Sequence, residues 1–331
     1  MHHRQLGTTN LKLPAISFGA GPVSGLMTGS QVEHQIEVIS RAFELGIDHF
    51  DTAATYGNGA SERALGHALS ELKIHDRVQI GTKVRLTIDD LSDIESAVRR
   101  SCESSFERLG VDRVALLQLH NSVTASRGDL PASLSVRDVL GDRGVISAME
   151  KMQQEGLIQA CGFTGLGDMS SLDKILKARF FQSAQIPLNL LLLFSGSDAT
   201  AGSVDVNYLE LTRKCLEDQV AVIAIRIMAG GALTQHAPSP HTYKTKFFTL
   251  DVFERDSKRS EELAKILPSG VTPPTASIRY VLDTLQATTA LIGFNCPEQV
   301  KEAVQASQHG PLEQEILGQL NNPRLAEKDY K

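Results

Sequence analysis

The stretch GIDHFDTAATYGNGASERALG, residues 46–66, joins a short apolar segment to a polar loop and then to a helical pattern. Asp51 and Tyr56 stand five positions apart in it, directly after the apolar segment. The next apolar run, VQIGTKV, carries Lys83 near its end, and the run after that, VALLQLH, ends in His120. We therefore expect four polar side chains at the ends of three successive strands. Because the carboxyl ends of the strands of a parallel barrel meet on one face, these four should share a site.

The same alternation of strand and helix continues on both sides of this stretch. Eight strand–helix units favour an α/β fold in which the parallel sheet closes into a (β/α)8 TIM barrel, as a single domain over residues 1–331. Before the first unit, residues 3–14 hold TTN between two short runs and predict an N-terminal β-hairpin. The expected strands are residues 13–20, 47–50, 78–84, 113–120, 158–164, 184–188, 220–227 and 287–294. The expected helices are residues 31–46, 61–72 (with Ser61 as N-cap), 89–110, 144–156, 171–180, 206–219, 257–267, 274–285 and 297–307.

Three connections are long: residues 121–143, residues 228–256 and the tail after residue 310. The first two follow the fourth and seventh strands, so we expect them on the C-terminal face as binding loops. A glycine cluster, GAGPVSG at residues 19–25, also follows a strand but is not followed directly by a helix, as a dinucleotide-binding loop would be. We therefore disfavour an open Rossmann fold and expect this loop to line the pocket over the first strand.

The composition excludes several classes of function. Charged residues make up 22% of the chain and the net charge is −6, without a basic cluster for nucleic acid or a membrane surface. The start, MHHRQLGTTN, has no apolar segment typical of a signal peptide, and no apolar stretch is long enough to span a bilayer. The four cysteines lie far apart and predict reduced thiols. We expect a cytoplasmic protein with no nucleic-acid, membrane or metal partner; the oligomeric state stays open.

The four polar residues suit the reduction of a carbonyl by a nicotinamide. Such a reaction needs a proton donor at the carbonyl oxygen, and Tyr56 can be that donor. The pKa of a free tyrosine is about 10, and a nearby ammonium lowers it by stabilising the phenolate. We expect Lys83 to supply the ammonium, Asp51 to hold Lys83, and His120 to position the substrate oxygen.

Each of the four residues also has an ordinary structural explanation. Asp51 and Lys83 form a type of ion pair that often only stabilises a fold, and a histidine or tyrosine is often only a packing residue. Their joint placement at consecutive strand ends favours the catalytic interpretation.

The motifs DTAATYG, SERALG, IGTKV and SSFERLGVDRVALLQLH resemble the signature blocks of the aldo-keto reductase superfamily. The resemblance extends in the right order over nearly the whole chain. It implies a (β/α)8 barrel that binds an extended nicotinamide dinucleotide without a Rossmann fold, and it implies the roles given above for the four residues. The wording YGNGASE and CGFTGLGD is similar to the branch of L-galactose, L-fucose and D-threo-aldose dehydrogenases.

The resemblance also implies a cofactor site. Thr164, Gly165 and Gln185 match positions that contact the carboxamide, although a Ser-Asn pair is usual where Thr164 and Gly165 stand. Ile225 or Arg226 takes the place of the usual aromatic residue under the nicotinamide ring. The remaining implied cofactor residues are Gly19, Asp51, Met228, Gly230, Gly231, Gly293, Phe294, Gln299 and Glu302. The implied substrate residues are Phe18, Tyr56, His120 and Asn121.

The positions at the adenosine end favour NAD over NADP. Members that select NADPH usually carry a basic residue where Gly293 stands and an arginine where Gln299 stands, and without them a 2′-phosphate loses charge-assisted hydrogen bonds. Lys301 offers a substitute charge, so NADP stays open. We expect an NAD(P)-dependent oxidoreductase acting on a small carbonyl compound or a sugar, with an aldose 1-dehydrogenase as one form. The alternatives are an NADPH-dependent aldehyde or ketone reductase and a slow-turnover cofactor-binding regulatory protein of the same fold.

Overall fold

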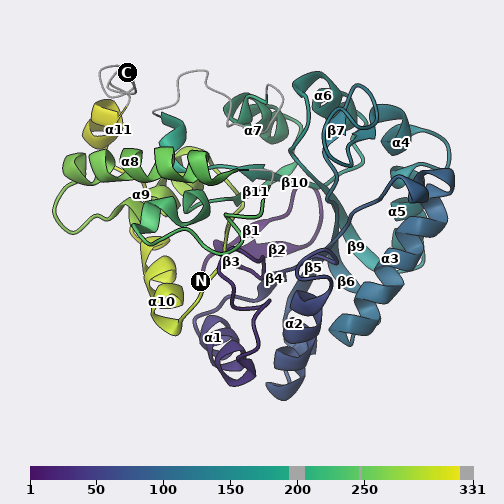
Figure 1. Ribbon diagram of the computed structural model, residues 1–331, viewed down its shortest axis with the longest axis horizontal. Helices are drawn as coiled ribbons and strands as arrows, with labels where there is room; N and C mark the ends of the chain where they lie inside the picture. Colours follow the sequence, from purple (N-terminus) through teal and green to yellow (C-terminus); the bar gives the residue numbers. More distant parts are fainter. Residues whose placement is uncertain (194–205, 246–247, 321–331) are drawn as a thin grey trace.

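The computed structural model describes residues 1–193, 206–245 and 248–320, and a closed barrel of parallel strands lies at its centre (Figure 1). The strands follow one another around the barrel in the order β10-β11-β12-β3-β4-β5-β6-β9. This confirms the (β/α)8 TIM barrel expected from the sequence. The barrel strands are β3 (Ile16–Gly19), β4 (His49–Asp51), β5 (Gln79–Val84), β6 (Val114–Leu119), β9 (Ile158–Thr164), β10 (Ser183–Pro187), β11 (Ala221–Ile225) and β12 (Thr289–Ile292).

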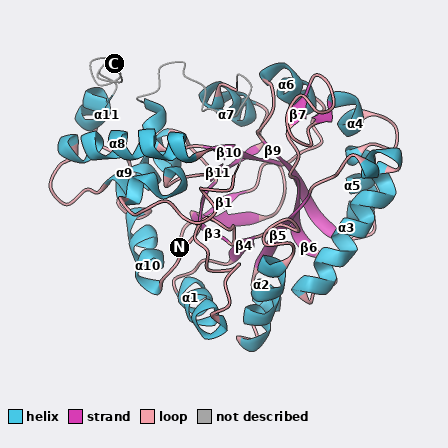
Figure 2. Ribbon diagram, viewed as in Figure 1, coloured by secondary structure: helices cyan, strands magenta, loops and turns pink. Residues whose placement is uncertain are grey.

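Helices surround the barrel on the outside, as Figure 2 shows by colour. Their apolar faces pack on the outward-facing side chains of the strands and form the larger of the two cores. None of these helices combines the length and the apolar character that crossing a bilayer requires, among the residues described. The helices are α1 (Val32–Glu44), α2 (Ala60–Glu71), α3 (Ile94–Leu109), α4 (Val136–Leu140), α5 (Val145–Gln154), α6 (Met169–Lys177), α7 (Tyr208–Glu217), α8 (Leu250–Ile266), α9 (Pro273–Arg279), α10 (Pro297–Ala306) and α11 (Gln314–Leu320).

The N-terminal hairpin closes one end of the barrel. It consists of β1 (His3–Gln5) paired antiparallel with β2 (Lys12–Pro14), as predicted. Leu6 and Leu13 of this segment pack against inward-facing side chains of the strands and form a second, smaller core. The strand residues of that core are Leu116, Ala160, Ala221, Ile223 and Leu291. The hairpin therefore seals the amino-terminal end of the barrel with apolar side chains.

Inward-facing side chains become polar toward the other end of the barrel. Because inward positions recur every second residue along a strand, Leu116 on β6 is followed inward by Gln118 and then by His120. Near the smaller apolar core, His49 Nδ1 lies 2.8 Å from Ser17 Oγ, which lies 2.7 Å from Thr289 Oγ1. Polar side chains therefore occupy the barrel interior between the smaller apolar core and the carboxyl ends of the strands, where the predicted site lies.

The connections expected to be long loops contain regular structure. Residues 121–143 hold a short parallel pair, β7 (Val123–Thr124) with β8 (Leu134–Ser135), and helix α4. In residues 228–256, a 3-10 segment spans Ala229–Thr234 and helix α8 begins at Leu250 instead of residue 257. Buried Val252 and Phe253 belong to the face of α8 that continues to Leu263, so the helical period begins earlier than predicted. The tail after residue 310 contains α11, and its residues 321–331 lie outside the described residues.

The prediction of Ser61 as an N-cap is wrong. Helix α2 begins after Gly59, whose φ of +80° lies in the left-handed region that favours glycine. Ser61 is already inside the helix and is buried. Its hydroxyl donates to the carbonyl oxygen of Ala20 over 2.7 Å and lies 2.8 Å from Thr52 Oγ1. Ser61 therefore ties the loop after β4 to the loop after β3.

Candidate active site

A buried ion pair lies at the floor of the site. Lys83 on β5 donates through its ammonium to Asp51 Oδ1 at the end of β4, and both side chains are shielded from solvent. The ammonium also donates to the carbonyl oxygen of Thr52 over 2.7 Å. The same nitrogen stands 4.8 Å from the centre of the Tyr56 ring. Three of the four predicted residues are thus in direct proximity, with the positive charge facing the tyrosine.

Two glutamines complete the hydrogen bonds of Asp51. Gln185 on β10 donates to Asp51 Oδ2 over 2.7 Å, and Gln118 on β6 donates to the same oxygen over 3.4 Å. A buried carboxylate needs such donors, because its transfer out of water is otherwise costly. Gln118 was not identified from the sequence, although a polar residue two positions before His120 on one strand was a usable signal. Gln185 reaches Asp51 across the barrel.

Tyr56 and His120 face each other above the ion pair. Their rings lie 5.6 Å apart at an interplanar angle of 85°. His120 Nδ1 lies 3.4 Å from Thr55 Oγ1. Gly21 passes close to the Tyr56 ring, so that a Cβ at this position would lie 3.7 Å from it. The fourth predicted residue is therefore also part of the group, and the glycine-rich loop after β3 borders it.

The surroundings set the protonation of these groups. Burial, together with Lys83 and Arg85, holds the pKa of His120 well below its usual range, so the imidazole is neutral at physiological pH. Burial lowers the pKa of Lys83, but Asp51 and Tyr56 outweigh it and the net direction is upward, which keeps the ammonium charged. Burial raises the pKa of Tyr56 while Lys83 lowers it, and the net direction is also upward. Tyr56 is accordingly protonated at neutral pH, in the form that donates a proton.

The loop that carries Tyr56 is held by a second buried network. Glu62 in the first turn of α2 is inaccessible to solvent and accepts a hydrogen bond of 2.6 Å from Thr82 Oγ1 on β5. Its other oxygen accepts one of 2.6 Å from Arg108 Nε on α3. The start of α2 is thereby fixed to the strand that carries Lys83, and the Tyr56 loop enters the helix at that point.

We expect Glu62→Ala to destabilise the protein, because the variant leaves Thr82 and Arg108 without their acceptor. The free energy of unfolding should fall by about 2–3 kcal/mol, since hydrogen bonds to charged groups are lost and Arg108 can still reach water. Urea denaturation measures this. Glu71→Ala, an exposed position on the same helix, is the control and should change stability by less than about 0.5 kcal/mol. Equal effects of the two variants would contradict the anchoring role of Glu62.

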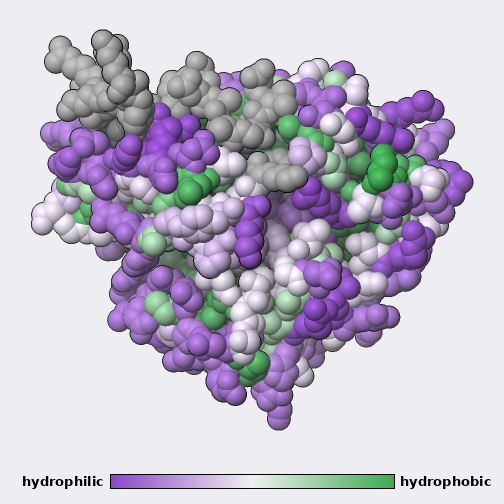
Figure 3. Space-filling view, in the orientation of Figure 1, coloured by the Kyte–Doolittle hydropathy of each residue, from purple (hydrophilic) through white to green (hydrophobic). Residues whose placement is uncertain are grey.

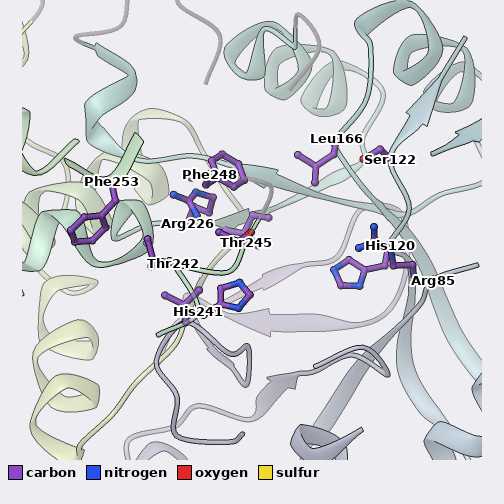
Figure 4. Close-up of a pocket in the computed structure, with 13 residues that line it drawn as sticks. Arg85, His120, Ser122, Leu166, Arg226, His241, Thr242, Thr245, Phe248 and Phe253 are labelled. Carbon is purple, nitrogen blue, oxygen red and sulfur yellow. The ribbon is translucent and has the colours of Figure 1, made fainter. Parts of the chain in front are cut away.

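A pocket opens above these residues at the carboxyl ends of the strands. The face seen in Figure 1 is hollowed near its centre in the space-filling view (Figure 3). His120 and Arg85 lie on one side of the pocket, Arg226 and Phe248 on the other, and His241 between them (Figure 4). The lining residues are Val23, Arg85, His120, Ser122, Leu166, Ile225, Arg226, Gly230, His241, Thr242, Thr245, Phe248 and Phe253.

Several predicted cofactor residues line or border this pocket. Ile225 ends β11, and Arg226 follows it with a φ of +57°. The Arg226 guanidinium lies 3.6 Å from the centre of the Phe248 ring. Burial lowers the pKa of Arg226 to about 10, against the opposing effect of Asp256. Phe248 therefore stacks on Arg226 in the pocket wall beside β11.

The residues predicted for the carboxamide lie on β9 and β10. The hydroxyl of Thr164 donates to the carbonyl oxygen of Leu119 over 3.0 Å, and the Gly165 amide donates to the Gln185 carbonyl oxygen over 2.8 Å. The Gln185 amide nitrogen donates to Asp51, as described above. Met228 and Gly231 form a turn through a hydrogen bond of 2.8 Å.

The residues predicted for the adenosine end gather at β12 and α10. A Cβ at Gly19 would lie 3.3 Å from the backbone of Ile292, so the loops after β3 and β12 approach each other closely here. Gly293 is exposed beside this contact. Gln299 Oε1 accepts a hydrogen bond of 2.8 Å from the Asn295 amide, and Glu302 is exposed on the same helix.

Of the residues predicted from the sequence, His120, Ile225, Arg226 and Gly230 line the pocket, whereas Phe18, Phe294 and Asn121 are buried and do not line it. Phe18 and Phe294 are buried, their ring centres are 5.6 Å apart, and both belong to the layer between barrel and helices. Asn121 is buried, and its side chain bonds to the backbone of Leu86 and Ala132. Phe18 and Asn121 thus stabilise the structure around the pocket and do not line it.

Sequence reasoning missed most of the pocket wall opposite His120. His241, Thr242, Thr245 and Phe248 come from the connection between the 3-10 segment after β11 and helix α8. Of the predicted substrate loop, residues 121–143, only Ser122 lines the pocket. The length of residues 228–256 indicated a binding loop. Which of its residues reach the pocket depends on how the loop folds over the barrel.

Comparisons with known proteins agree with this architecture. Residues 15–322 match the model of the Aldo/keto reductase family. L-galactose dehydrogenase from Arabidopsis thaliana is 26% identical over 310 residues, 92% of this chain and 87% of that protein. D-threo-aldose 1-dehydrogenase from a Pseudomonas species is 26% identical over 321 residues, 88% of each. The resemblance noted in the motifs, including the branch, is confirmed.

Solved structures show the same fold. The holo form of the aldo-keto reductase AKR11C1 from Bacillus halodurans has a TM-score of 0.72 at 23% identity, covering 98% of this chain and 97% of that chain. The glycerol dehydrogenase AKR11B4 from Gluconobacter oxydans has a TM-score of 0.70 at 21% identity, covering 96% and 94%.

Proposed function

This chain belongs to the aldo/keto reductase family and is an oxidoreductase, and we propose that it interconverts a carbonyl and an alcohol with Tyr56 as general acid and base. The observation that carries the proposal is the buried Asp51–Lys83 pair, whose ammonium lies 4.8 Å from the Tyr56 ring, next to His120 in the pocket lining. Asp51 keeps Lys83 charged, and Lys83 opposes the rise in the Tyr56 pKa that burial causes. The charge is therefore placed to help the phenol release its proton.

Each residue has a defined role in the proposed step. Tyr56 donates its phenolic proton to the carbonyl oxygen during reduction and takes a proton from the alcohol during oxidation. Neutral His120 holds that oxygen by a hydrogen bond, and its depressed pKa keeps it from competing as an acid. A bound reduced nicotinamide would supply the hydride that adds to the carbonyl carbon. Gln185 and Gln118 hold Asp51, so that the ammonium stays directed at Tyr56.

The charges around the pocket fit a dinucleotide. Among the described residues, its lining includes Arg85 and Arg226 and no aspartate or glutamate. A pyrophosphate carries negative charge, so this set of side chains is suited to it. Gly230, with a φ of +72°, brings the backbone close to the Arg226 guanidinium, since a Cβ there would lie 3.2 Å from it. We propose that Arg226, Met228, Gly230 and Gly231 hold the pyrophosphate and that Ile225 packs under the nicotinamide ring.

For the other parts of the cofactor we propose the residues implied by the motifs. Gln185 and Thr164 border the carboxamide, and Gly293, Gln299 and Glu302 border the adenosine. The inward-facing positions of Thr164 and Gln185 on paired strands support the first assignment. The close approach of the β3 and β12 loops supports the second.

The substrate we propose is a sugar or another small polar carbonyl compound, oxidised or reduced at one carbon. Two relatives over most of the chain are named as dehydrogenases of sugars. A matrix of activities tests the proposal: NAD, NADP and their reduced forms against aldoses, aldehydes and ketones, followed by absorbance of the reduced nicotinamide. Turnover of at least one pair is expected. Binding of cofactor without turnover of any pair would instead support a regulatory protein.

We propose NAD as the preferred cofactor, because no basic side chain stands at Gly293 or Gln299 to meet a 2′-phosphate. NAD(H) should bind more tightly than NADP(H) in a titration of cofactor fluorescence. Gln299→Arg should strengthen NADPH binding by at most about 1.5–3 kcal/mol, as for a charge-assisted hydrogen bond. Gln305→Arg adds the same charge farther along α10, at an exposed position, and should have little effect. Tighter NADPH binding by the unchanged protein would contradict the preference and direct attention to Lys301.

A further inference from the structure

Arg85 is a half-buried cation beside the catalytic histidine. It follows Val84, the last residue of β5, and stands two positions after Lys83, so the strand period turns it toward the same face. It lines the pocket together with His120 (Figure 4). Its charge acts on the imidazole, since it helps to lower the pKa of His120.

In the part of the chain that the structure describes, the Arg85 guanidinium contacts a backbone carbonyl oxygen and not a carboxylate. Its Nη2 donates to the carbonyl oxygen of Pro131 over 3.2 Å. No carboxylate of the described residues forms an ion pair with it, and burial alone lowers its pKa. Arg127, on the loop that follows β7, contrasts with it, because Arg127 pairs with Asp138 through two nitrogens. A partly desolvated guanidinium without a carboxylate has donors left for an anion.

The two arginines of the pocket lie on opposite walls. Arg226 belongs to the wall formed by β11, Gly230 and Phe248, where the cofactor is proposed to lie. Arg85 belongs to the wall formed by His120 and Ser122, where the reacting oxygen is proposed to lie (Figure 4). The charge of Arg85 is thus available to the substrate.

We propose that Arg85 binds a carboxylate or phosphate group of the substrate, so that the enzyme acts on a carbonyl compound, or its alcohol, that carries an anion. The inference rests on the proposed carbonyl–alcohol chemistry of this pocket and narrows its substrate class. The anion is bound and not transformed; it orients the carbonyl toward Tyr56 and His120. With an overall charge of −6, the chain does not attract anions in general, and a local cation is needed for this selectivity.

Matched substrate pairs test the proposal by kinetics. The pairs are succinic semialdehyde with butanal, for a carboxylate, and glyceraldehyde phosphate with glyceraldehyde, for a phosphate. The unchanged protein should have the higher kcat/KM for the charged member of at least one pair, and that pair identifies the anion. In Arg85→Gln the ratio of kcat/KM between charged and uncharged members should fall at least about tenfold, mainly through KM, as for loss of a charge-assisted contact.

Gln is chosen because its amide still donates to the Pro131 carbonyl oxygen, so the variant removes the charge and retains a donor. Arg85→Lys should recover part of the preference. Arg100→Gln, at an exposed position on α3, removes one positive charge away from the pocket and should leave the ratio unchanged. A preference for uncharged members in the unchanged protein, or an equal loss for both members in Arg85→Gln, would overturn the proposal. A weaker affinity of Arg85→Gln for NADH would also overturn it, by assigning Arg85 to the cofactor.

A binding measurement separates this proposal from the proposed reaction. Calorimetry with succinate, and with succinamide as its uncharged match, needs no turnover and is done with and without NAD. Succinate should bind the unchanged protein, with at least about tenfold weaker binding to Arg85→Gln. Equal succinate affinities, or no succinate binding to either protein, would reject a carboxylate site even if the enzyme turns over neutral carbonyls; the same titration with inorganic phosphate decides a phosphate site. Selective succinate binding without any turnover would instead reject the proposed reaction.

Discussion

Tyr56→Phe should reduce turnover in both directions by at least about a hundredfold, as expected when a general acid is removed. The variant retains the ring that faces His120 at 5.6 Å and lies 4.8 Å from the Lys83 ammonium, so it should disturb the site little. Because the phenolic oxygen would act on the substrate and not on the cofactor, the dissociation constant of the cofactor should stay within about twofold of the original. Steady-state kinetics and cofactor titration measure the two quantities.

Tyr243→Phe is the matched control for this variant. Tyr243 is exposed, with 63% of its area accessible, and it is not among the residues that line the pocket. Its loss of a hydroxyl should leave turnover unchanged. Turnover of Tyr56→Phe close to that of the unchanged protein would reject Tyr56 as the acid and base.

Lys83→Met should lower the rate of alcohol oxidation on the order of a hundredfold and move its alkaline limb to higher pH. Oxidation needs the Tyr56 phenolate, so its rate rises with pH through the pKa of Tyr56. Burial already raises that pKa, and Lys83 opposes the rise. Without the ammonium the pKa is higher still, and the limb must shift upward. The rate profile between neutral pH and the onset of unfolding measures the shift.

Lys83→Arg serves as the control, because it keeps a positive charge beside Asp51. It should show a smaller shift than Lys83→Met, even if its longer side chain costs activity. A Lys83→Met profile that is slower but not shifted would assign Lys83 to a structural ion pair with Asp51. His120 should contribute no limb between about pH 5 and 8, since its pKa lies well below the usual range of histidine.

Much of the fold was predictable because local sequence patterns report burial. Strands buried on both sides read as short apolar runs, and the helices that cover them show a 3.6-residue period. The predicted start of α8 was wrong because Val252 and Phe253 extend the helical period into a stretch that was expected to be a loop. The prediction of Ser61 as an N-cap was wrong because its hydroxyl donates to the carbonyl oxygen of Ala20, in the loop after β3. Such a contact has no local signature.

The sequence alone was enough to predict that the four residues we propose as the catalytic group lie together. The closing of a parallel barrel brings the ends of β4, β5 and β6 together whatever the details of the loops, so strand position was enough to place Asp51, Lys83 and His120. Tertiary structure alone decided what surrounds them. The donors from Gln118 and Gln185 to Asp51 depend on side chains that meet across the barrel. The pocket wall that holds His241 and Phe248, and the position of Arg85 opposite that wall, depend on segments that meet over the rim of the barrel. These contacts join segments that are far apart in the sequence, and they depend on how the loops between the strands and helices fold. The spacing of residues along the sequence therefore does not predict them.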